Sequence, residues 1–200
     1  ISQFGKDPTG RYYLPLNLII VLALSLFAWI ILRKQRWLGL LVIILVVGIN
    51  TVDTMRAISL PEKITTQFDV VTRFDNSYDS SLIKFLNENQ ITRGYTNYWV
   101  SYRLAFLSDE KLIFTPKLPY KLDLRYPLAD DRYPIYDNFV SQATKIAYIT
   151  TSQPDLDQRI RDGFIREEIR WDETTIGFYH IFFDLSQKIT PEKLKVYSAN

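Results

Sequence analysis

The sequence LPLNLIIVLALSLFAWIIL at residues 14–32 contains no charged residue, and after RKQR (33–36) a second apolar run follows, WLGLLVIILVVGINTV (37–52). An α-helix rises about 1.5 Å per residue and a bilayer core is about 30 Å thick, so about 20 apolar residues span it. We therefore predict a two-helix transmembrane hairpin, with helices at about 14–32 and 37–58. The alternative for the second, shorter run is a buried or interfacial helix.

The charges between the two runs predict the orientation of the chain. Arg33, Lys34 and Arg36 lie in a very short connection, where an excess of Lys and Arg marks the cytoplasmic side. We expect the N-terminus and everything after Leu60 to be extracytoplasmic. The predicted location is the plasma membrane, as a multi-pass protein whose first partner is the lipid bilayer.

Charge and composition limit the function of the outer part. The 200 residues carry a net charge of +2, but residues 1–60 hold six Lys or Arg against two Asp or Glu, and residues 61–200 hold 18 against 20. The outer part therefore has no polybasic surface, and we expect no nucleic-acid partner. The absence of cysteine excludes disulfides and thiolate catalysis. We divide the chain into the membrane hairpin (1–60) and an extracytoplasmic domain (61–200).

Helical and strand patterns alternate in the outer domain. We expect helices at about 79–89, 98–108 and 155–162, strands at about 64–73, 91–95, 111–115 and 145–151, and an antiparallel pair at 164–171 and 175–185. Gly163 is expected in the left-handed conformation that follows a helix, and residues 117–138 are expected to be irregular. This pattern predicts a small α/β domain with a mixed sheet and a C-terminal β-hairpin.

An aromatic stripe marks the predicted helix at 98–108. Tyr98, Tyr102 and Phe106 recur every fourth residue, and Trp99 lies beside them. One interpretation is a helix that packs its rings onto the sheet. The other is a platform for a sugar or a lipid headgroup, because Tyr95 and Tyr98 lie where a strand ends and a helix begins, which is where open α/β sheets bind ligands.

The loop at 117–138 repeats Arg-Tyr-Pro at Arg125 and Arg132. Two arginines suit a phosphate or a carboxylate, although Pro and Asp also form turns that bind nothing. Asp130 and Asp131 suit either a divalent cation or a solvated turn. A hydrolase that uses Asp130 or Asp137 is a further hypothesis for this loop.

Classical catalytic signatures are missing. His180 is the single histidine, and we interpret it as a structural residue on a strand, since no Ser-His-Asp arrangement can be assembled around it. The sequence contains neither a P-loop nor GxGxxG. We assign no catalytic residue, no metal ligand and no cofactor.

Three segments resemble a family: DPTGRYYLPL (7–16), LIKFL (82–86) and GYTNYW (94–99). The first is similar to the GRYLLPL-type segment of bacterial GT-C membrane glycosyltransferases, relatives of protein O-mannosyltransferases and of the aminoarabinose transferase. The other two resemble the extracytoplasmic domain after the last helices of such enzymes. The resemblance implies sugar transfer from a polyprenyl-phosphate donor, with Arg11 and Tyr12 contacting the donor phosphate. No residue here matches the catalytic aspartate of that family, which lies near the N-terminus of the full enzyme.

Besides the hydrolase, two functions remain open. The chain is expected to be the C-terminal segment of such a glycosyltransferase, because it starts at Ile1 rather than Met and matches only the end of the family pattern. Its outer domain would assist the binding of a lipid-linked sugar through Tyr95, Tyr98, Trp99, Arg125 and Arg132. The alternative is a non-enzymatic, membrane-anchored interaction or assembly subunit of a larger membrane complex, with other membrane subunits as partners.

Overall fold

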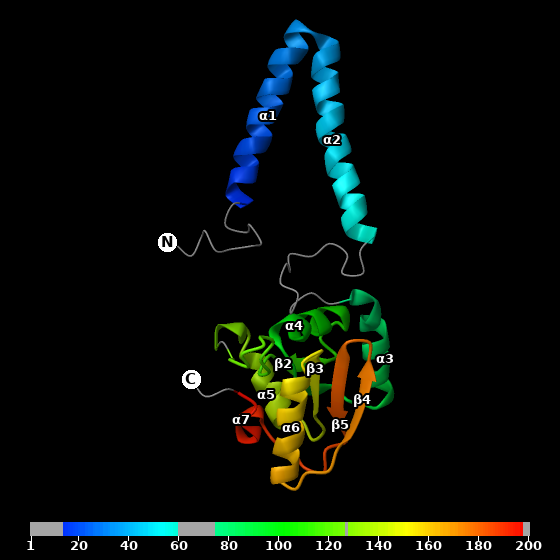
Figure 1. Cartoon of the computed structure of the whole chain (residues 1–200), viewed down its shortest axis with the longest axis vertical. Helices are drawn as coiled ribbons and strands as arrows, with labels where there is room; N and C mark the ends of the chain where they lie inside the picture. The colour runs from blue at the N-terminus through cyan, green and yellow to red at the C-terminus, as the bar shows by residue number, and fades with distance from the viewer. Residues whose placement is uncertain (1–13, 60–74, 127, 198–200) are drawn as a thin grey trace. The chain divides into compact units, whose positions relative to one another are not determined.

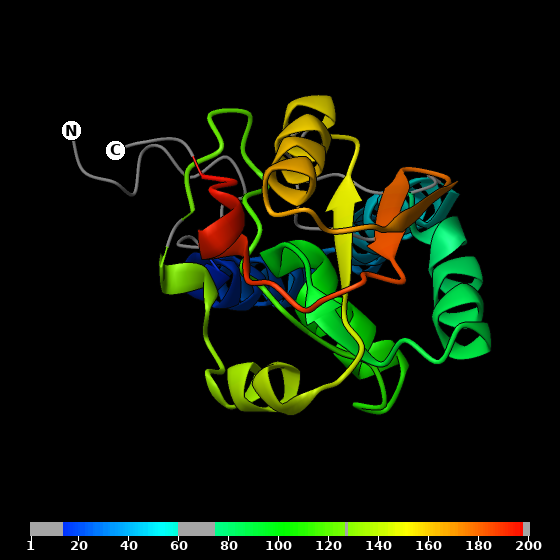
Figure 2. The same cartoon turned by 90° about the horizontal axis from the view of Figure 1, so that it is seen from below.

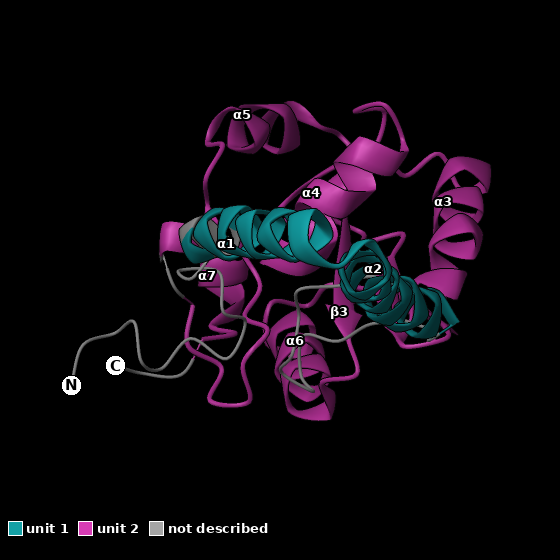
Figure 3. Cartoon of the chain, turned by 90° about the horizontal axis from the view of Figure 1, so that it is seen from above, with its two compact units in different colours: residues 1–73 teal, residues 74–200 magenta. Residues whose placement is uncertain are grey.

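The structure, a computed structural model, describes residues 14–59, 75–126 and 128–197. The chain divides into two compact units, residues 1–73 and 74–200 (Figure 3). The strand predicted at 64–73 and two predicted site residues, Arg11 and Tyr12, lie outside the described residues.

The first unit contains two long helices, α1 (Leu14–Lys34) and α2 (Arg36–Ser59). The predicted loop at 33–36 shrinks to Gln35, whose N–H donates to the carbonyl of Ile31 at 2.7 Å. Gly39 permits this tight connection, since a Cβ there would lie 2.4 Å from Cγ of Leu32. Among the described residues, one helix, α2, is long and apolar enough to cross a membrane. That finding alone does not confirm the predicted transmembrane pair.

The second unit is an α/β domain with a mixed five-stranded sheet in the order β2-β1-β3-β5-β4 (Figure 1). Its strands are β1 (Arg93–Tyr95), β2 (Ile113–Thr115), β3 (Ala147–Thr151), β4 (Asp172–Ile176) and β5 (Tyr179–Phe183). β1 pairs in parallel with β2 and β3, whereas β5 pairs antiparallel with β3 and β4. The predicted fold class, mixed sheet and closing hairpin are therefore present.

Helices cover both faces of this sheet. They are α3 (Asp79–Glu88), α4 (Tyr98–Leu107), α5 (Ile135–Gln142), α6 (Pro154–Arg166) and α7 (Pro191–Leu194), with 3-10 turns η4 (Asn76–Tyr78) and η5 (Leu128–Asp130). Apolar residues of α3 and α4 pack with alternate strand residues such as Ala147 and Ile149. Those of α6 and α7 pack with Tyr148 and Phe182 on the other face. Figure 2 shows α6 and α7 beside each other, across β3 from α3.

The predicted end of the 155–162 helix is wrong. α6 continues to Arg166, and Gly163 lies inside it. The glycine is required by packing, because a Cβ there would lie 2.8 Å from Cδ2 of Leu194 on α7. The left-handed residue that follows this helix is Glu168, with φ 56°.

The predicted boundaries of the C-terminal hairpin are also wrong. Residues 167–171 are not in a strand, and the pair consists of β4 and β5, joined at Gly177. Gly177 has φ +60°, a conformation that favours glycine. The polar residues 172–174, which separate the two predicted strands, instead begin the exposed edge strand β4.

The region 117–138 is more ordered than predicted. Its last part begins helix α5, which packs against β2 at the edge of the sheet. Tyr136 is buried there with Ala105 and Ile113. This helix escaped prediction because it has only eight residues and its start follows a run of Pro, Tyr and Asp.

Candidate functional site

The carboxyl ends of β1, β2 and β3 meet at one edge of the sheet. The segment after β1 is joined to its neighbours by backbone bonds: Thr96 N–H donates to Thr115 O at 3.0 Å, and Leu118 N–H donates to Thr96 O at 2.9 Å. The helices after β1 and β3, α4 and α6, pack on opposite faces of the sheet. This is the arrangement that opens a ligand crevice between neighbouring parallel strands.

Buried polar side chains lie at this edge of the sheet. Asn97, which is 1 % exposed, caps α4 by accepting from the N–H groups of Trp99 and Val100 at 3.0 and 3.2 Å. Its amide group donates to the Thr151 hydroxyl at 2.9 Å. One asparagine therefore fixes both the start of α4 and its position relative to β3.

An aromatic platform lies over the first turns of α4. We define it as Tyr98, Trp99, Tyr102 and Tyr120 with the Arg132 guanidinium. The Tyr98 ring lies edge-on to Trp99 at 5.0 Å and to Tyr102 at 5.4 Å, and Trp99 meets Tyr120 at 6.1 Å. Arg132 Cζ lies 4.8 Å from the centre of the Tyr98 ring, a cation–π distance. Three predicted site residues, Tyr98, Trp99 and Arg132, are thus brought together.

Tyr102 holds the loop that carries Arg132. Its hydroxyl accepts from the Arg132 backbone N–H at 2.8 Å and donates to the Asp130 carbonyl at 3.2 Å. Burial raises the pKa of Tyr102, so the phenol stays protonated and keeps both bonds. Tyr102, a member of the aromatic stripe predicted from the sequence, therefore packs onto the loop that carries Arg132 rather than onto the sheet.

Two buried polar atoms near Tyr120 have no hydrogen-bond partner among the described residues. They are Nε1 of Trp99, a donor, and Oε1 of Gln153, an acceptor. Gln153 is 3 % exposed, and its amide nitrogen donates to the Tyr120 carbonyl. An unpaired buried polar group costs about 1–3 kcal/mol, so a ligand that supplies the missing partner of either atom removes that cost.

A charged cluster, the Lys117 triad, continues the edge of the site. Lys117 Nζ lies 2.9 Å from Asp131 Oδ2 and 2.7 Å from Asp137 Oδ2. Burial raises the pKa of Asp137, and the hydrogen bond from Lys117 offsets only part of that rise. Burial acts to lower the pKa of Lys117, but its bonds to Asp137 and Asp131 outweigh this and raise it. Asp131 is therefore paired with Lys117. The interpretation of Asp130 and Asp131 as a solvated turn is wrong for Asp131.

The other predicted site residues lie elsewhere. Tyr95 is 6 % exposed and its ring packs on Tyr148 at 5.2 Å in the core, where burial raises its pKa to about 12. Arg125 is exposed and lies 3.9 Å from Asp123. Neither residue belongs to the platform, so the prediction that all five outer residues form one site is not supported.

Sequence reasoning missed three residues of this edge: Lys117, Tyr120 and Gln153. Each follows the end of a parallel strand by two to five residues, which is where ligand-binding loops of α/β sheets start. That rule was applied to the end of β1 but not to the ends of β2 and β3.

His180 has partners on both ring nitrogens. Nδ1 lies 3.0 Å from the Thr175 hydroxyl, and Nε2 lies 3.3 Å from Arg161 Nη2 and 3.4 Å from Glu173 Oε2. Its ring packs on Phe182 at 4.6 Å. This environment agrees with the interpretation of His180 as a structural residue. Among the residues that the structure describes, no group of three His, Cys, Asp or Glu could hold a metal ion.

The chain matches no protein-family model, no curated protein and no solved structure.

Proposed function

We propose that this chain is the C-terminal segment of an integral-membrane glycosyltransferase, in which α1 and α2 cross the membrane and the α/β domain binds the sugar of a polyprenyl-phosphate donor outside the cytoplasm. The membrane part of the proposal draws on two apolar helices that flank Arg33, Lys34 and Arg36. The domain contributes binding, and we assign the transfer step to no described residue.

One observation carries the sugar-binding part: the unpaired Trp99 donor and Gln153 acceptor beside Tyr120. Sugar hydroxyls both accept and donate hydrogen bonds, so the several hydroxyls of one sugar suit both the indole donor and the glutamine acceptor. Flat rings such as Tyr98 and Tyr120 suit the apolar face of a sugar ring. Arg132, on the same platform, suits the phosphate of a lipid-linked sugar.

The test is sugar binding by the full chain in nanodiscs. The probes are farnesyl-phosphate-linked hexoses and pentoses, and saturation-transfer NMR reports which sugar protons contact protein. We expect Trp99→Phe, which keeps the ring but removes the N–H, to weaken binding by about 2- to 10-fold, the value of one hydrogen bond. Gln153→Leu should do the same, and Arg132→Ala should weaken probes that carry phosphate but not free sugars.

Two matched controls sharpen this test. Trp171→Phe removes an indole N–H that lies 3.5 Å from Glu173, outside the platform, and Arg125→Ala removes the other Arg-Tyr-Pro arginine. Both should leave binding unchanged. Absence of saturation transfer to any sugar, or equal binding by all variants, would contradict the proposal.

A second candidate, an assembly subunit, is favoured by the far end of α4. Phe106 is 81 % exposed and Leu107 is 45 % exposed, beside a groove of about 550 Å³ that Tyr136 also lines. Exposed apolar residues in a cluster mark protein contacts. If the second candidate holds, Phe106→Ser releases a stoichiometric membrane partner on purification, whereas Trp99→Phe retains it.

A further inference from the structure

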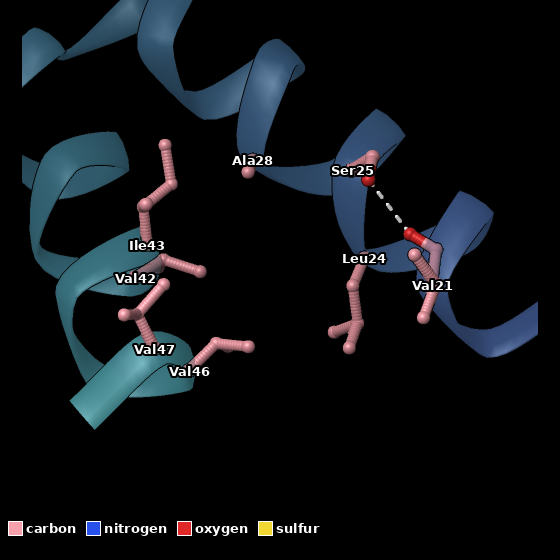
Figure 4. A pocket seen from close by; sticks show the side chains of 8 residues that line it. All are labelled: Val21, Leu24, Ser25, Ala28, Val42, Ile43, Val46 and Val47. Carbon is pink, nitrogen blue, oxygen red and sulfur yellow. Dashed lines mark hydrogen bonds between the residues drawn. The ribbon is translucent and has the colours of Figure 1, made fainter. Parts of the chain in front are cut away.

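A narrow apolar cleft separates α1 from α2 (Figure 4). The helices approach closely near their junction, where Ala28 is 7 % exposed and Gly39 is buried. Further along, Val21 and Leu24 of α1 face Val46 of α2 across a cavity of about 200 Å³. The one hydroxyl in the lining, that of Ser25, donates to the Val21 carbonyl at 2.7 Å, so the cleft offers no free donor.

Three cations stand at the closed end of the cleft. Arg33 and Lys34 end α1 and Arg36 begins α2, and all three are exposed. The sequence contains no Asp or Glu between residues 14 and 52, so the helices themselves do not neutralise this charge. The Arg33 guanidinium lies 4.1 Å from the centre of the Trp29 ring, which holds it at the helix end.

The depth of the cleft below these cations matches a lipid. At about 1.5 Å per residue, Ala28 lies about 8 Å below Arg33 and Val21 about 18 Å below it. On α2, Val42 lies about 9 Å below Arg36 by the same rise. The cleft therefore starts one headgroup length below the charges and ends near the middle of a bilayer core of about 30 Å.

The volume selects a single hydrocarbon chain. A further α-helix of about 10 Å diameter would need about 400 Å³ for each turn of 5.4 Å, twice the whole cavity of about 200 Å³. A dry cavity of about 150 Å³ already accommodates benzene. Several methylene groups of one acyl chain therefore fit where a helix does not.

We propose that the cleft binds one acyl chain of an anionic phospholipid, whose phosphate is bound by Arg33, Lys34 and Arg36. The proposal rests on the insertion of α1 and α2 in the membrane, which is part of the proposed function. Its occupant is a lipid of the leaflet on the cation side, and not the sugar-carrying lipid, which the α/β domain meets on the opposite side.

The test is native mass spectrometry of the full chain released from nanodiscs that contain equimolar phosphatidylglycerol and phosphatidylcholine. We expect one phosphatidylglycerol to be retained per chain. Neutralising the cations in the triple variant Arg33→Gln, Lys34→Gln and Arg36→Gln should lower this retention by about 10-fold or more. Ala28→Phe, which fills the cleft, should do the same while all three cations remain.

Leu18→Phe is the matched control, because Leu18 is 66 % exposed on the same helix and does not line the cleft; it should retain the lipid. Equal retention of both phospholipids, or undiminished retention by Ala28→Phe, overturns the proposal. Extraction of the chain from membranes by alkaline carbonate would instead overturn the membrane insertion, and so the proposed function. The two failures are therefore distinguishable.

Discussion

Asp79 should be a main contributor to the stability of the α/β domain. Its side chain is 10 % exposed, and Oδ2 accepts from Arg103 Nε at 2.6 Å and from Nη2 at 2.5 Å. Oδ1 accepts from the hydroxyl of Tyr179, which is 2 % exposed, at 2.7 Å. This one carboxylate therefore joins α3, α4 and β5.

The stability cost of Asp79→Ala comes from the two groups that lose their partner, the Tyr179 hydroxyl and the Arg103 guanidinium. The buried Tyr179 hydroxyl loses its acceptor, at about 1–3 kcal/mol. Arg103 is 39 % exposed and regains water, so its share is at most about 1 kcal/mol. We expect a total of about 1–4 kcal/mol in the free energy of unfolding.

The assay is urea unfolding of the full chain in detergent, followed by near-UV circular dichroism. Tyr179→Phe removes the group that Asp79→Ala leaves unpaired, so in that background the cost of Asp79→Ala should fall by about 1–2 kcal/mol. Glu88→Ala, on the same helix, breaks an exposed pair with Lys84 at 3.8 Å and should change stability by less than about 0.5 kcal/mol. The predicted role of Asp79 is refuted if Asp79→Ala lowers the free energy of unfolding no more than Glu88→Ala does. It is also refuted if the losses caused by Asp79→Ala and Tyr179→Phe simply add in the double variant.

Three further outcomes are expected from the same unfolding measurement. Gly94→Ala should cost at least about 3 kcal/mol, because its Cβ would lie 2.0 Å from the Ala147 carbonyl oxygen, whereas Gly48→Ala, with nothing within 4 Å, should cost little. Burial raises the pKa of Asp157 above its usual 3.8. The folded state then binds this proton more tightly than the unfolded chain, and stability falls as pH rises through the raised pKa. Asp157→Asn should remove this pH-dependent loss of stability. The free energy of unfolding of the variant, relative to the parent, should therefore increase from acid to neutral pH. A difference in stability that does not change with pH would contradict the raised pKa of Asp157. Tyr148→Phe removes a buried bond of 2.7 Å to a backbone carbonyl and should cost about 1 kcal/mol.

The sequence predicts the elements of the α/β domain because its signals are local. The apolar strand at β3 and the periodic helix α4 are each specified within a few residues. Helix ends were predicted less well. Gly163 has the composition of a helix stop, but its conformation is decided by contact with Leu194, thirty-one positions away in the sequence.

The site was predicted in part for the same reason. Tyr98 and Trp99 follow a strand directly, so the position of the strand locates them. Tyr95 was misplaced because strand residues alternate between faces, and its side of the sheet is the one that α6 buries.

Gln153 shows why the rest of the site needs the fold. In the sequence it is an unremarkable residue before Pro154, and a glutamine in a turn would ordinarily be solvated. Its burial follows from three strands that end side by side, and its partner is the backbone of Tyr120, in the segment after β2. An unpaired buried acceptor is a property of that convergence, not of any motif. The same holds for the indole N–H of Trp99, whose ring the periodicity alone would assign to the core. A ligand that pairs with both atoms must supply an acceptor for the indole and a donor for the glutamine, and sugar hydroxyls supply both. A phosphate diester has no hydroxyl and can pair only with the indole, so the relative affinity for free sugars and for dimethyl phosphate, measured on Trp99→Phe and Gln153→Leu, tests the proposed sugar site.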